Sequence, residues 1–347
     1  MIERVLLAEP RGFCAGVEMA IKALTWMVKV FEPPVYCYHE IVHNEWVVAA
    51  FEQAGVVFVD DVSSVPEGAI LMLSAHGSAP EVVAEAGRRS AVVIDSVCPL
   101  VTKVHHEVKR MAEDGVEILY VGHAGHDEAV GTVAVAPGSI TLVEPEAGLA
   151  GITPGGGPVA LLAQTTLGMH EWADVLGQAK ASRPDVMTAR KSDLCYATTN
   201  RQEAVGVLAD KCDLVLVVGS ENSSNTQALV RTCRQLGTRA YRVDSAGQIR
   251  SEWMEAASTV GVTAGASAPD HLVQEVIDRL APVGGVELVS TITEGEYFPL
   301  PPQLRSLLTV LQALVEAGVT ARAPKAGGRL DHDREWTASE ALLLLTS

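Results

Sequence analysis

Three cysteines occupy equivalent places in the sequence. Cys14, Cys98 and Cys195 each follow an apolar run or a short turn, and each precedes a stretch in which apolar residues recur at helical spacing. Each is therefore predicted at a helix start, where backbone N–H groups and the helix dipole favour a thiolate and should lower the thiol pKa. Three thiolates from three separate parts of the chain can share a zinc ion or hold an iron–sulfur cluster that leaves one iron open.

A single cysteine at a helix start is more often a small buried hydrophobe than a ligand, and it is the threefold repetition that favours ligands. The other cysteines, Cys37, Cys212 and Cys233, fall inside strand or helix patterns, and we expect them in the core. No two cysteines form a C-x-x-C pair, which argues against ribbon-type zinc sites and thioredoxin chemistry.

A second set of polar residues keeps step with the three cysteines. Between 28 and 30 residues after each cysteine, a predicted strand ends at His43, His126 and Asn225, respectively. A further strand end follows in each third of the chain, at His76, Thr165 and Ser267. Ser, Thr and Asn at such places often do no more than cap helices. Nine positions in phase, however, predict a pseudo-threefold assembly whose carboxyl-end turns meet at one cavity.

The donors in these turns suit an anionic ligand. Helix starts rich in N–H and hydroxyl donors bind phosphate groups well, and residues 221–225 (ENSSN) offer several in succession. Together with His43 and His76, this run suits a diphosphate. One carboxylate, Glu128, falls in the same ring of turns, just after His126. Apolar walls and a bound anion would raise its pKa and let it pass protons; the alternative is a first-turn Glu that only benefits from the helix dipole.

The elements that must position these residues alternate between strand and helix patterns along the chain. Strands are predicted at residues 5–9, 34–39, 69–75, 92–95, 117–122, 159–164, 214–220 and 260–267. Many of these runs are apolar on both faces, which is typical of parallel strands covered by helices on each side. The pattern therefore predicts an α/β fold with right-handed crossovers, in which ligands bind beyond the carboxyl ends of the strands.

Composition narrows the classes of partner. Lys and Arg number 26 and Asp and Glu 43 among 347 residues, so the formal net charge is −17. This charge argues against a general nucleic-acid or anionic-membrane surface, and an anionic ligand must be held by local donors. No apolar run reaches the ~18 residues of a membrane span, and Met1 begins a strand rather than a signal peptide. We therefore expect a cytoplasmic protein whose cysteines need not form disulfides.

Nine motifs carry a resemblance to a known family. They are PRGFCAGV, HEIVHN, SAHG, CPLVTKVH, GHAGH, QTTL, CYATTNRQEAV, GSENSSN and VTAGASAP, and they lie within residues 4–305. On these motifs the chain resembles the 4-hydroxy-3-methylbut-2-enyl diphosphate reductases, the last enzymes of the methylerythritol phosphate route to isoprenoids. The resemblance implies an α/β trefoil of three pseudo-threefold-related αβα domains, with mostly parallel sheets, around a 4Fe–4S cluster. The cluster ligands would be Cys14, Cys98 and Cys195.

The same resemblance implies an activity and roles for the polar residues. The reaction would be the reductive dehydroxylation of a small diphosphate to isopentenyl and dimethylallyl diphosphates, with the substrate's C4 oxygen on the open iron. The electrons would come from a ferredoxin- or flavodoxin-type donor. The diphosphate would be held by His43, His76, Ser223, Ser224, Asn225 and Ser267. His126 and Glu128 would serve the hydroxyl end and proton delivery, with Thr165 nearby.

The implied domains are residues 1–96, 97–192 and 193–305, followed by a C-terminal extension at 306–347. One departure from the family pattern is Asp127, which stands where the family often has Pro and adds a carboxylate near the mouth of the site. The other is the extension, in which an amphipathic helix pattern (SLLTVLQALVEAG) and a linker-like stretch (PKAGGRLDHDREW) precede an apolar end (ASEALLLLT). We expect the extension to pack on a domain or a second subunit, because its apolar face should not stay exposed.

Two other functions are open alternatives. Quinolinate synthase is also built as a three-cysteine trefoil around a cluster with one open iron, although its motifs match less well. A zinc-stabilised protein that binds a phosphate ligand without turnover would belong to a different class. A brown colour after anaerobic purification would exclude zinc.

Overall fold

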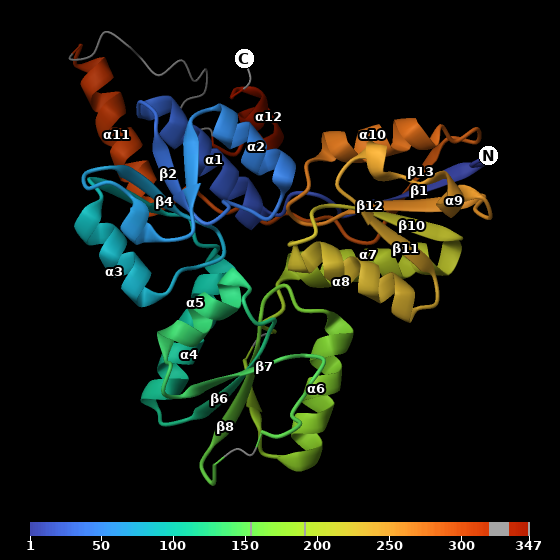
Figure 1. Cartoon of the computed structure of the whole chain (residues 1–347), viewed down its shortest axis with the longest axis horizontal. Helices are drawn as coiled ribbons and strands as arrows, with labels where there is room; N and C mark the ends of the chain where they lie inside the picture. Colours follow the sequence, from blue (N-terminus) through green and yellow to red (C-terminus); the bar gives the residue numbers. More distant parts are fainter. Residues whose placement is uncertain (153–154, 191, 319–332, 346–347) are drawn as a thin grey trace. The chain divides into compact units, whose positions relative to one another are not determined.

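The computed structural model describes residues 1–152, 155–190, 192–318 and 333–345 (Figure 1). Its strands are β1 (Arg4–Glu9), β2 (Val35–Tyr38), β3 (Val56–Val59), β4 (Ile70–Leu73), β5 (Val92–Asp95), β6 (Glu117–Val121), β7 (Ile140–Val143), β8 (Val159–Ala163), β9 (Met187–Thr188), β10 (Leu214–Val218), β11 (Arg239–Val243), β12 (Thr259–Ala264) and β13 (Val286–Ser290). The helices are α1 (Ala15–Val30), α2 (Glu45–Gln53), α3 (Pro80–Arg89), α4 (Pro99–Glu113), α5 (Asp127–Val135), α6 (Met169–Ser182), α7 (Tyr196–Lys211), α8 (Ser224–Gln235), α9 (Ser251–Met254), α10 (Asp270–Leu280), α11 (Pro302–Glu316) and α12 (Ala338–Leu343), with short 3₁₀ turns η1 (Val62–Ser64) and η2 (Ala246–Gln248).

The described strands form three sheets in which neighbouring strands are parallel. The sheet orders are β3-β2-β4-β5, β7-β6-β8-β9 and β11-β10-β12-β1-β13. In each sheet one strand, β2, β6 or β10, lies between the two strands that follow it in the chain. The predicted α/β fold with mostly parallel sheets is thus confirmed, and the repeated strand order fits the repeat that the spacing of the polar residues indicated.

The chain divides into two compact units. Unit 1 comprises Met1–Cys14 and Leu100–Gly295 and holds the second and third sheets; unit 2 comprises Ala15–Pro99 and Glu296–Ser347 and holds the sheet of β2 to β5. Strand β1 pairs with β12 and β13, so the N-terminal residues complete the sheet built from the last third of the chain. The division into domains at 1–96, 97–192, 193–305 and 306–347, and their trefoil arrangement, stay predictions.

Helices cover both faces of the sheets in unit 1, as the apolar strand patterns predicted. Along β10, Leu214, Leu216 and Val218 face a core shared with α10, whereas Val215 and Val217 face a core shared with α7 and α8 (Figure 1). The second sheet is covered in the same way, by α4 and α5 on one face and by α6 on the other. Burying one such side chain contributes about 1.5–3 kcal/mol, so the two-sided cores hold the strand ends firmly in place.

In unit 2, the described end of the C-terminal extension packs on α1. The Trp336 ring meets the Trp26 ring edge-on, with centroids 6.1 Å apart. The buried Lys22 donates from Nζ to the Asp333 carbonyl at 3.1 Å and lies 5.6 Å from the centre of the Trp336 ring. Residues 333–345 of the extension therefore pack on a domain. In α11, the helix on which the prediction rested, Leu308 is buried but Val310 and Leu314 are exposed. Most of the predicted linker lies outside the described residues. None of the helices in the described ranges combines the length and the apolarity that a bilayer crossing needs.

Candidate functional site

The predicted site residues of unit 1 lie where strands end and helices begin. Cys195, Ser223 and His126 are the N-cap residues of α7, α8 and α5. Cys14 directly precedes α1, and Ser267 lies in the turn between β12 and α10. Because the strands of each sheet are parallel, these turns all belong to the carboxyl edges of their sheets, where α/β proteins bind ligands.

Asn225 connects the loops of two of the cysteines. The Cys14 N–H donates to the Ala266 carbonyl at 3.2 Å, and the Ala266 N–H donates to Asn225 Oδ1 at 2.9 Å. Asn225 Nδ2 donates to Thr198 Oγ1 at 3.5 Å. Thr198 in turn contacts Cys195 Sγ through its hydroxyl at 3.1 Å and through its N–H at 3.3 Å. The third sheet, in unit 1, therefore brings Cys14, Asn225 and Cys195 into one hydrogen-bonded group.

The thiol of Cys195 does not have the lowered pKa that its helix-start position predicted. The pKa is raised to about 11, mainly because the sulfur is removed from water and secondly because of the nearby Cys14 thiol, although the two Thr198 donors act in the opposite direction. The prediction for this residue was wrong because desolvation outweighs the helix terminus. The Cys195 thiol would ionise readily beside a cation, and a bound metal deprotonates a thiol outright.

Glu128 is buried, with 2% of its surface exposed, in the first turn of α5. Its Oε1 accepts from the Thr165 N–H at 2.6 Å, and its Oε2 accepts from the Thr165 hydroxyl at 2.8 Å. Burial raises the pKa of Glu128 to about 7 despite these two hydrogen bonds, in the direction predicted from the sequence. The Thr165 carbonyl accepts the Cys195 N–H at 3.0 Å, so Thr165 links the carboxyl group to a cysteine.

The serines of the predicted anion site have different surroundings. The Ser223 hydroxyl accepts from the Thr226 N–H at 3.3 Å and so caps α8, which was the simpler interpretation of such residues. The Ser224 hydroxyl lies 3.2 Å from Nε2 of Gln164, the residue that precedes Thr165. Ser267 is buried in the loop that contains Ala266. The start of α8 thus places Ser224 and Asn225 beside the turns that carry Thr165 and Cys195.

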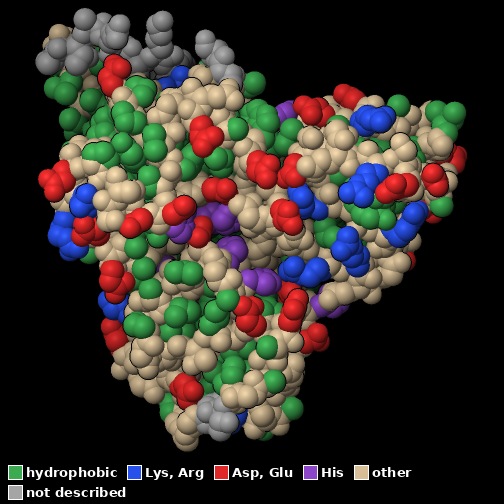
Figure 2. Space-filling model, in the orientation of Figure 1, with side chains coloured by type: hydrophobic (Ala, Val, Ile, Leu, Met, Phe, Trp, Pro, Cys, Tyr) green, Lys and Arg blue, Asp and Glu red, His purple; other side chains and the backbone are tan. Residues whose placement is uncertain are grey.

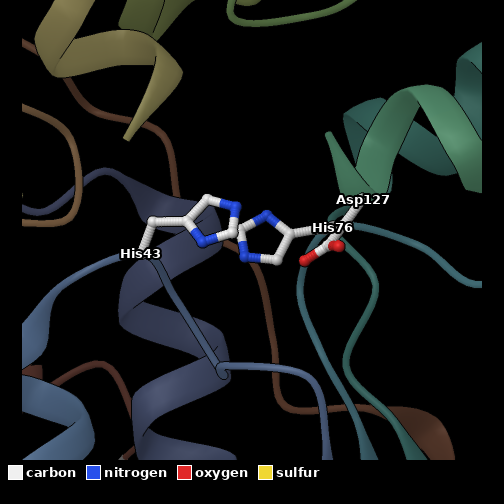
Figure 3. A group of neighbouring side chains, drawn as sticks. All are labelled: His43, His76 and Asp127. Atoms are coloured by element: carbon white, nitrogen blue, oxygen red, sulfur yellow. The ribbon is translucent and has the colours of Figure 1, made fainter. Parts of the chain in front are cut away.

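Unit 2 brings together the three predicted residues that it contains. The rings of His43 and His76 stack, with centroids 3.9 Å apart and planes 12° from parallel (Figure 3). His43 Nδ1 lies 3.2 Å from Glu40 Oε2, which orients the ring. The Cys98 N–H donates to the carbonyl of Ala75, the residue before His76, at 3.0 Å. Two imidazoles and one thiol therefore share the carboxyl edge of the sheet of β2 to β5.

Asp127 occupies the first position of α5, directly after the N-cap His126, whose Nδ1 accepts the Glu128 N–H at 3.2 Å. The first helical position is the one that Pro favours, and acidic side chains are also stabilised in the first turn. Asp127, which stands where the family often has Pro, is therefore compatible with an ordinary helix start.

Sequence reasoning missed three residues that support the site. Thr198 donates to the Cys195 sulfur, as described above. Asp193 is buried, accepts the Ala163 N–H at 3.2 Å, and has a pKa raised to about 7 by burial. Arg201 is fully buried and donates from Nη2 to the Gly12 carbonyl at 2.8 Å, which fixes the turn before Cys14. Thr198 and Arg201 lie within the motif CYATTNRQEAV, but the motif alone does not reveal which groups they contact.

Comparison with known proteins gives consistent matches. A model of the LytB protein family matches residues 5–281. The 4-hydroxy-3-methylbut-2-enyl diphosphate reductase of Cutibacterium acnes is 46% identical over 311 residues, which cover 88% of this chain and 96% of that protein. The protein of the same name from Acidothermus cellulolyticus is 45% identical over 335 residues, covering 95% of this chain and 97% of its own length.

A solved structure agrees with these matches. The structure of the E-1-hydroxy-2-methyl-but-2-enyl-4-diphosphate reductase from Plasmodium falciparum superposes with a TM-score of 0.87 at 31% identity, covering 90% of this chain and 100% of that one. From the family match and from the identity over nearly the full length of the relatives, it follows that this chain belongs to the LytB protein family.

Proposed function

We propose that the protein reduces 4-hydroxy-3-methylbut-2-enyl diphosphate to isopentenyl and dimethylallyl diphosphates, the last step of the non-mevalonate route to isoprenoids. The names of relatives that match 88% and 95% of the chain support this proposal. The observation that carries the chemistry is the buried Glu128, which has a pKa of about 7 and is joined through Thr165 to Cys195. Removal of a hydroxyl group as water needs a proton donor beside a reducing centre, and this group supplies the donor.

The donor set fits an iron–sulfur cluster with three cysteine ligands, Cys14, Cys98 and Cys195. All six cysteines of the chain are free thiols, and these three are partly exposed at helix starts. The Cys195 thiol, whose pKa burial raises to about 11, suits a metal ligand, because a bound metal stabilises the thiolate that burial disfavours. A 4Fe–4S cluster held this way would supply an open iron for the substrate oxygen and the electrons for the reduction. The same free cysteines suit the reducing cytoplasm.

Residues of the chain itself would supply protons and contact the hydroxyl end of the substrate. The overall reaction breaks the C4–O bond, consumes two electrons and two protons, and releases the hydroxyl group as water. Glu128 holds one proton near neutral pH because its ionised form is poorly solvated. The Thr165 hydroxyl, 2.8 Å from Oε2, can both donate and accept, so it can pass this proton on. His126, the N-cap residue of α5, would contact the hydroxyl end of the substrate beside Glu128 and Thr165.

The diphosphate would be held by neutral donors and imidazoles. In unit 1 these are Ser223, Ser224, Asn225 and Ser267, and in unit 2 they are His43 and His76. Helix starts bind phosphate groups through backbone N–H groups and the dipole, so an acidic protein can hold this ligand without a basic surface. The electrons would come from a ferredoxin- or flavodoxin-type protein.

Asn225→Ala is expected to weaken the binding of isopentenyl diphosphate about ten- to a hundredfold. The change removes an amide that connects the loops of Cys14 and Cys195, and a hydrogen bond to a charged ligand is worth roughly 1.5–3 kcal/mol. Anaerobic calorimetry of product binding would measure the effect. His170→Ala, at an exposed position of α6, is the control and should bind as the unchanged protein does. Equal affinities in the two variants would reject the proposed anion site.

The proposed function is tested by anaerobic turnover with the hydroxylated diphosphate and reduced methyl viologen. Oxidation of the viologen and release of the two C5 diphosphates should occur in a two-to-one ratio of electrons to product, and the protein should be brown before the assay. A colourless protein that binds zinc and the diphosphate but yields no product would instead support a binding protein. Product formed from a different substrate, such as the precursors of quinolinate, would support the other alternative.

A further inference from the structure

An arginine-lined groove lies beside the third sheet, in unit 1, outside the site described above. Its volume is about 670 Å³, and its walls come from α8, β11, η2 and the start of α9. Three guanidinium groups line it, those of Arg234, Arg242 and Arg250. Figure 2 shows Lys and Arg side chains gathered over this part of the molecule.

The groove is a local exception to the charge of the protein. Residues 221–252 contain five arginines and three acidic residues, Glu221, Asp244 and Glu252, whereas the whole chain has a net charge of −17. Arg242 is paired with Asp244 and lies 3.9 Å from Glu221. Arg234 donates to the neutral Ala240 carbonyl at 2.8 Å, so no carboxylate compensates its charge there. Arg250 is 68% exposed at its side chain and lies 3.7 Å from the equally exposed Glu252, a pair that water screens. Arg234 and Arg250 are therefore the groups that present positive charge to an incoming partner.

The aromatic residues of the groove leave little room for a small planar ligand. The rings of Tyr241 and Trp253 stack on each other with centroids 4.1 Å apart and planes 1° from parallel. The Arg250 guanidinium covers Trp253, 5.5 Å from the ring centre. Because Tyr241 stacks on Trp253 and Arg250 also covers that ring, a nucleotide base or a free flavin would find the Trp253 ring already in contact with other groups. Recognition in the groove depends on charge, which suits the surface of an acidic protein.

A short series of contacts connects the groove with Cys195. Arg242 Nη1 donates to the Gly219 carbonyl at 3.1 Å. Gly219 lies directly on the start of α8, because a Cβ added to it would stand 2.4 Å from Thr226 Oγ1. The neighbour of Thr226 in that turn, Asn225, donates to Thr198, which contacts the Cys195 sulfur at 3.1 Å. A protein seated in the groove would thus lie against the structure that holds a cysteine of the reducing centre.

We propose that this groove is the docking surface for the electron donor, a small acidic ferredoxin. The inference rests on the proposed function, since the reaction consumes two electrons for each C4–O bond broken. The ferredoxin delivers them one at a time and is oxidised, while the substrate gains two protons and loses water. Opposite charges speed such encounters and fix the orientation of the two proteins, and a charge-based surface of this kind suits a partner that must leave after each electron.

The test uses the full-length holoenzyme and a purified acidic 2Fe–2S ferredoxin. Arg234→Glu with Arg250→Glu reverses two charges in the groove and leaves Arg242 in place. The matched control is Lys109→Glu with Arg110→Glu on the exposed end of α4, which changes the net charge equally. The groove variant should bind ferredoxin about ten- to a hundredfold more weakly at low salt, by interferometry, and the control should bind within about twofold of the unchanged protein. The difference should shrink at 1 M salt, where charges are screened beyond about 3 Å.

Turnover separates this proposal from the proposed function. With reduced methyl viologen the groove variant should keep its rate, whereas with ferredoxin its rate should fall in proportion to the lost binding. Arg250→Gln alone, at an exposed position, guards against a folding defect and should show a smaller loss of the same kind. Equal loss of ferredoxin binding in the groove variant and the α4 control would overturn the docking surface. Absence of turnover with viologen in the unchanged protein would overturn the proposed function, and the binding measurement would still decide on the groove.

Discussion

Cys195→Ser is expected to abolish most of the iron content and essentially all turnover of the anaerobically purified protein. Changes beside a metal ligand already cost about 10–100-fold in metal affinity or activity, so losing the ligand itself should cost at least as much. A serine hydroxyl at this position would still accept from Thr198, so the N-cap of α7 and the fold should survive. Iron analysis and the visible spectrum measure the loss, and circular dichroism shows that the protein is folded.

The control for Cys195→Ser is a cysteine at the other end of α7. Cys212 is the C-cap residue of α7 and packs beside Gly261 and Leu208 rather than near the strand-end turns. Cys212→Ser should keep its iron and its turnover, at a modest cost in thermal stability. Full iron content in Cys195→Ser, or an equal loss in Cys212→Ser, would show that Cys195 is not a ligand.

Glu128→Gln is expected to lower turnover by roughly 10²–10⁴-fold, the usual contribution of general acid–base catalysis, while the iron content and product affinity stay near normal. The amide keeps the shape of the carboxyl group and can still accept the Thr165 N–H that now binds Oε1. It cannot release and regain a proton, which is the property that the mechanism uses. Single-turnover measurements with excess reduced viologen would report the chemical step separately from electron supply.

The pH dependence gives a second measurement on Glu128. An acid whose pKa is raised to about 7 keeps its proton below that pH and loses it above, so turnover of the unchanged protein should decline as the pH rises through about 7. Tyr120, Asp193 and Cys195 face the same region, and burial also raises the pKa of Asp193 to about 7. The contribution of Glu128 is therefore the difference between the pH profile of the unchanged protein and that of Glu128→Gln. Near-normal turnover of Glu128→Gln with an unchanged profile would mean that the proton arrives by another route.

The fold was predictable from the sequence in its local units but less so in its long-range pairing. Apolar runs on both faces of the strands indicated parallel sheets, because the two-sided cores leave that pattern in each strand. The place of β1 was not visible, since its pairing with β12 and β13 joins residues at opposite ends of the chain. No local pattern records which strands become neighbours when all of them are apolar.

The candidate site, too, was predictable from the sequence only in part. The spacing of the motifs brought out Cys14, Cys195 and Asn225, and the structure joins these three through Ala266 and Thr198. The sign of the pKa shift at Cys195 could not be foreseen, because the helix terminus and desolvation oppose each other and only the packing decides between them. The buried guanidinium of Arg201 was missed for a related reason, since arginine in a helical pattern usually lies on the surface.

The packing of the C-terminal extension on α1 also affects how the protein is made. Helix α1 leaves the ribosome early, but Asp333 and Trp336, which cover Lys22 and Trp26, are translated more than three hundred residues later. At about 5–20 residues per second, this delay is on the order of tens of seconds. During that time the nascent helix presents an indole ring and an ammonium group, paired only with Glu18 of the same helix, that the finished protein covers. Unit 2 is therefore the part of the nascent chain where we expect the greatest need for chaperones.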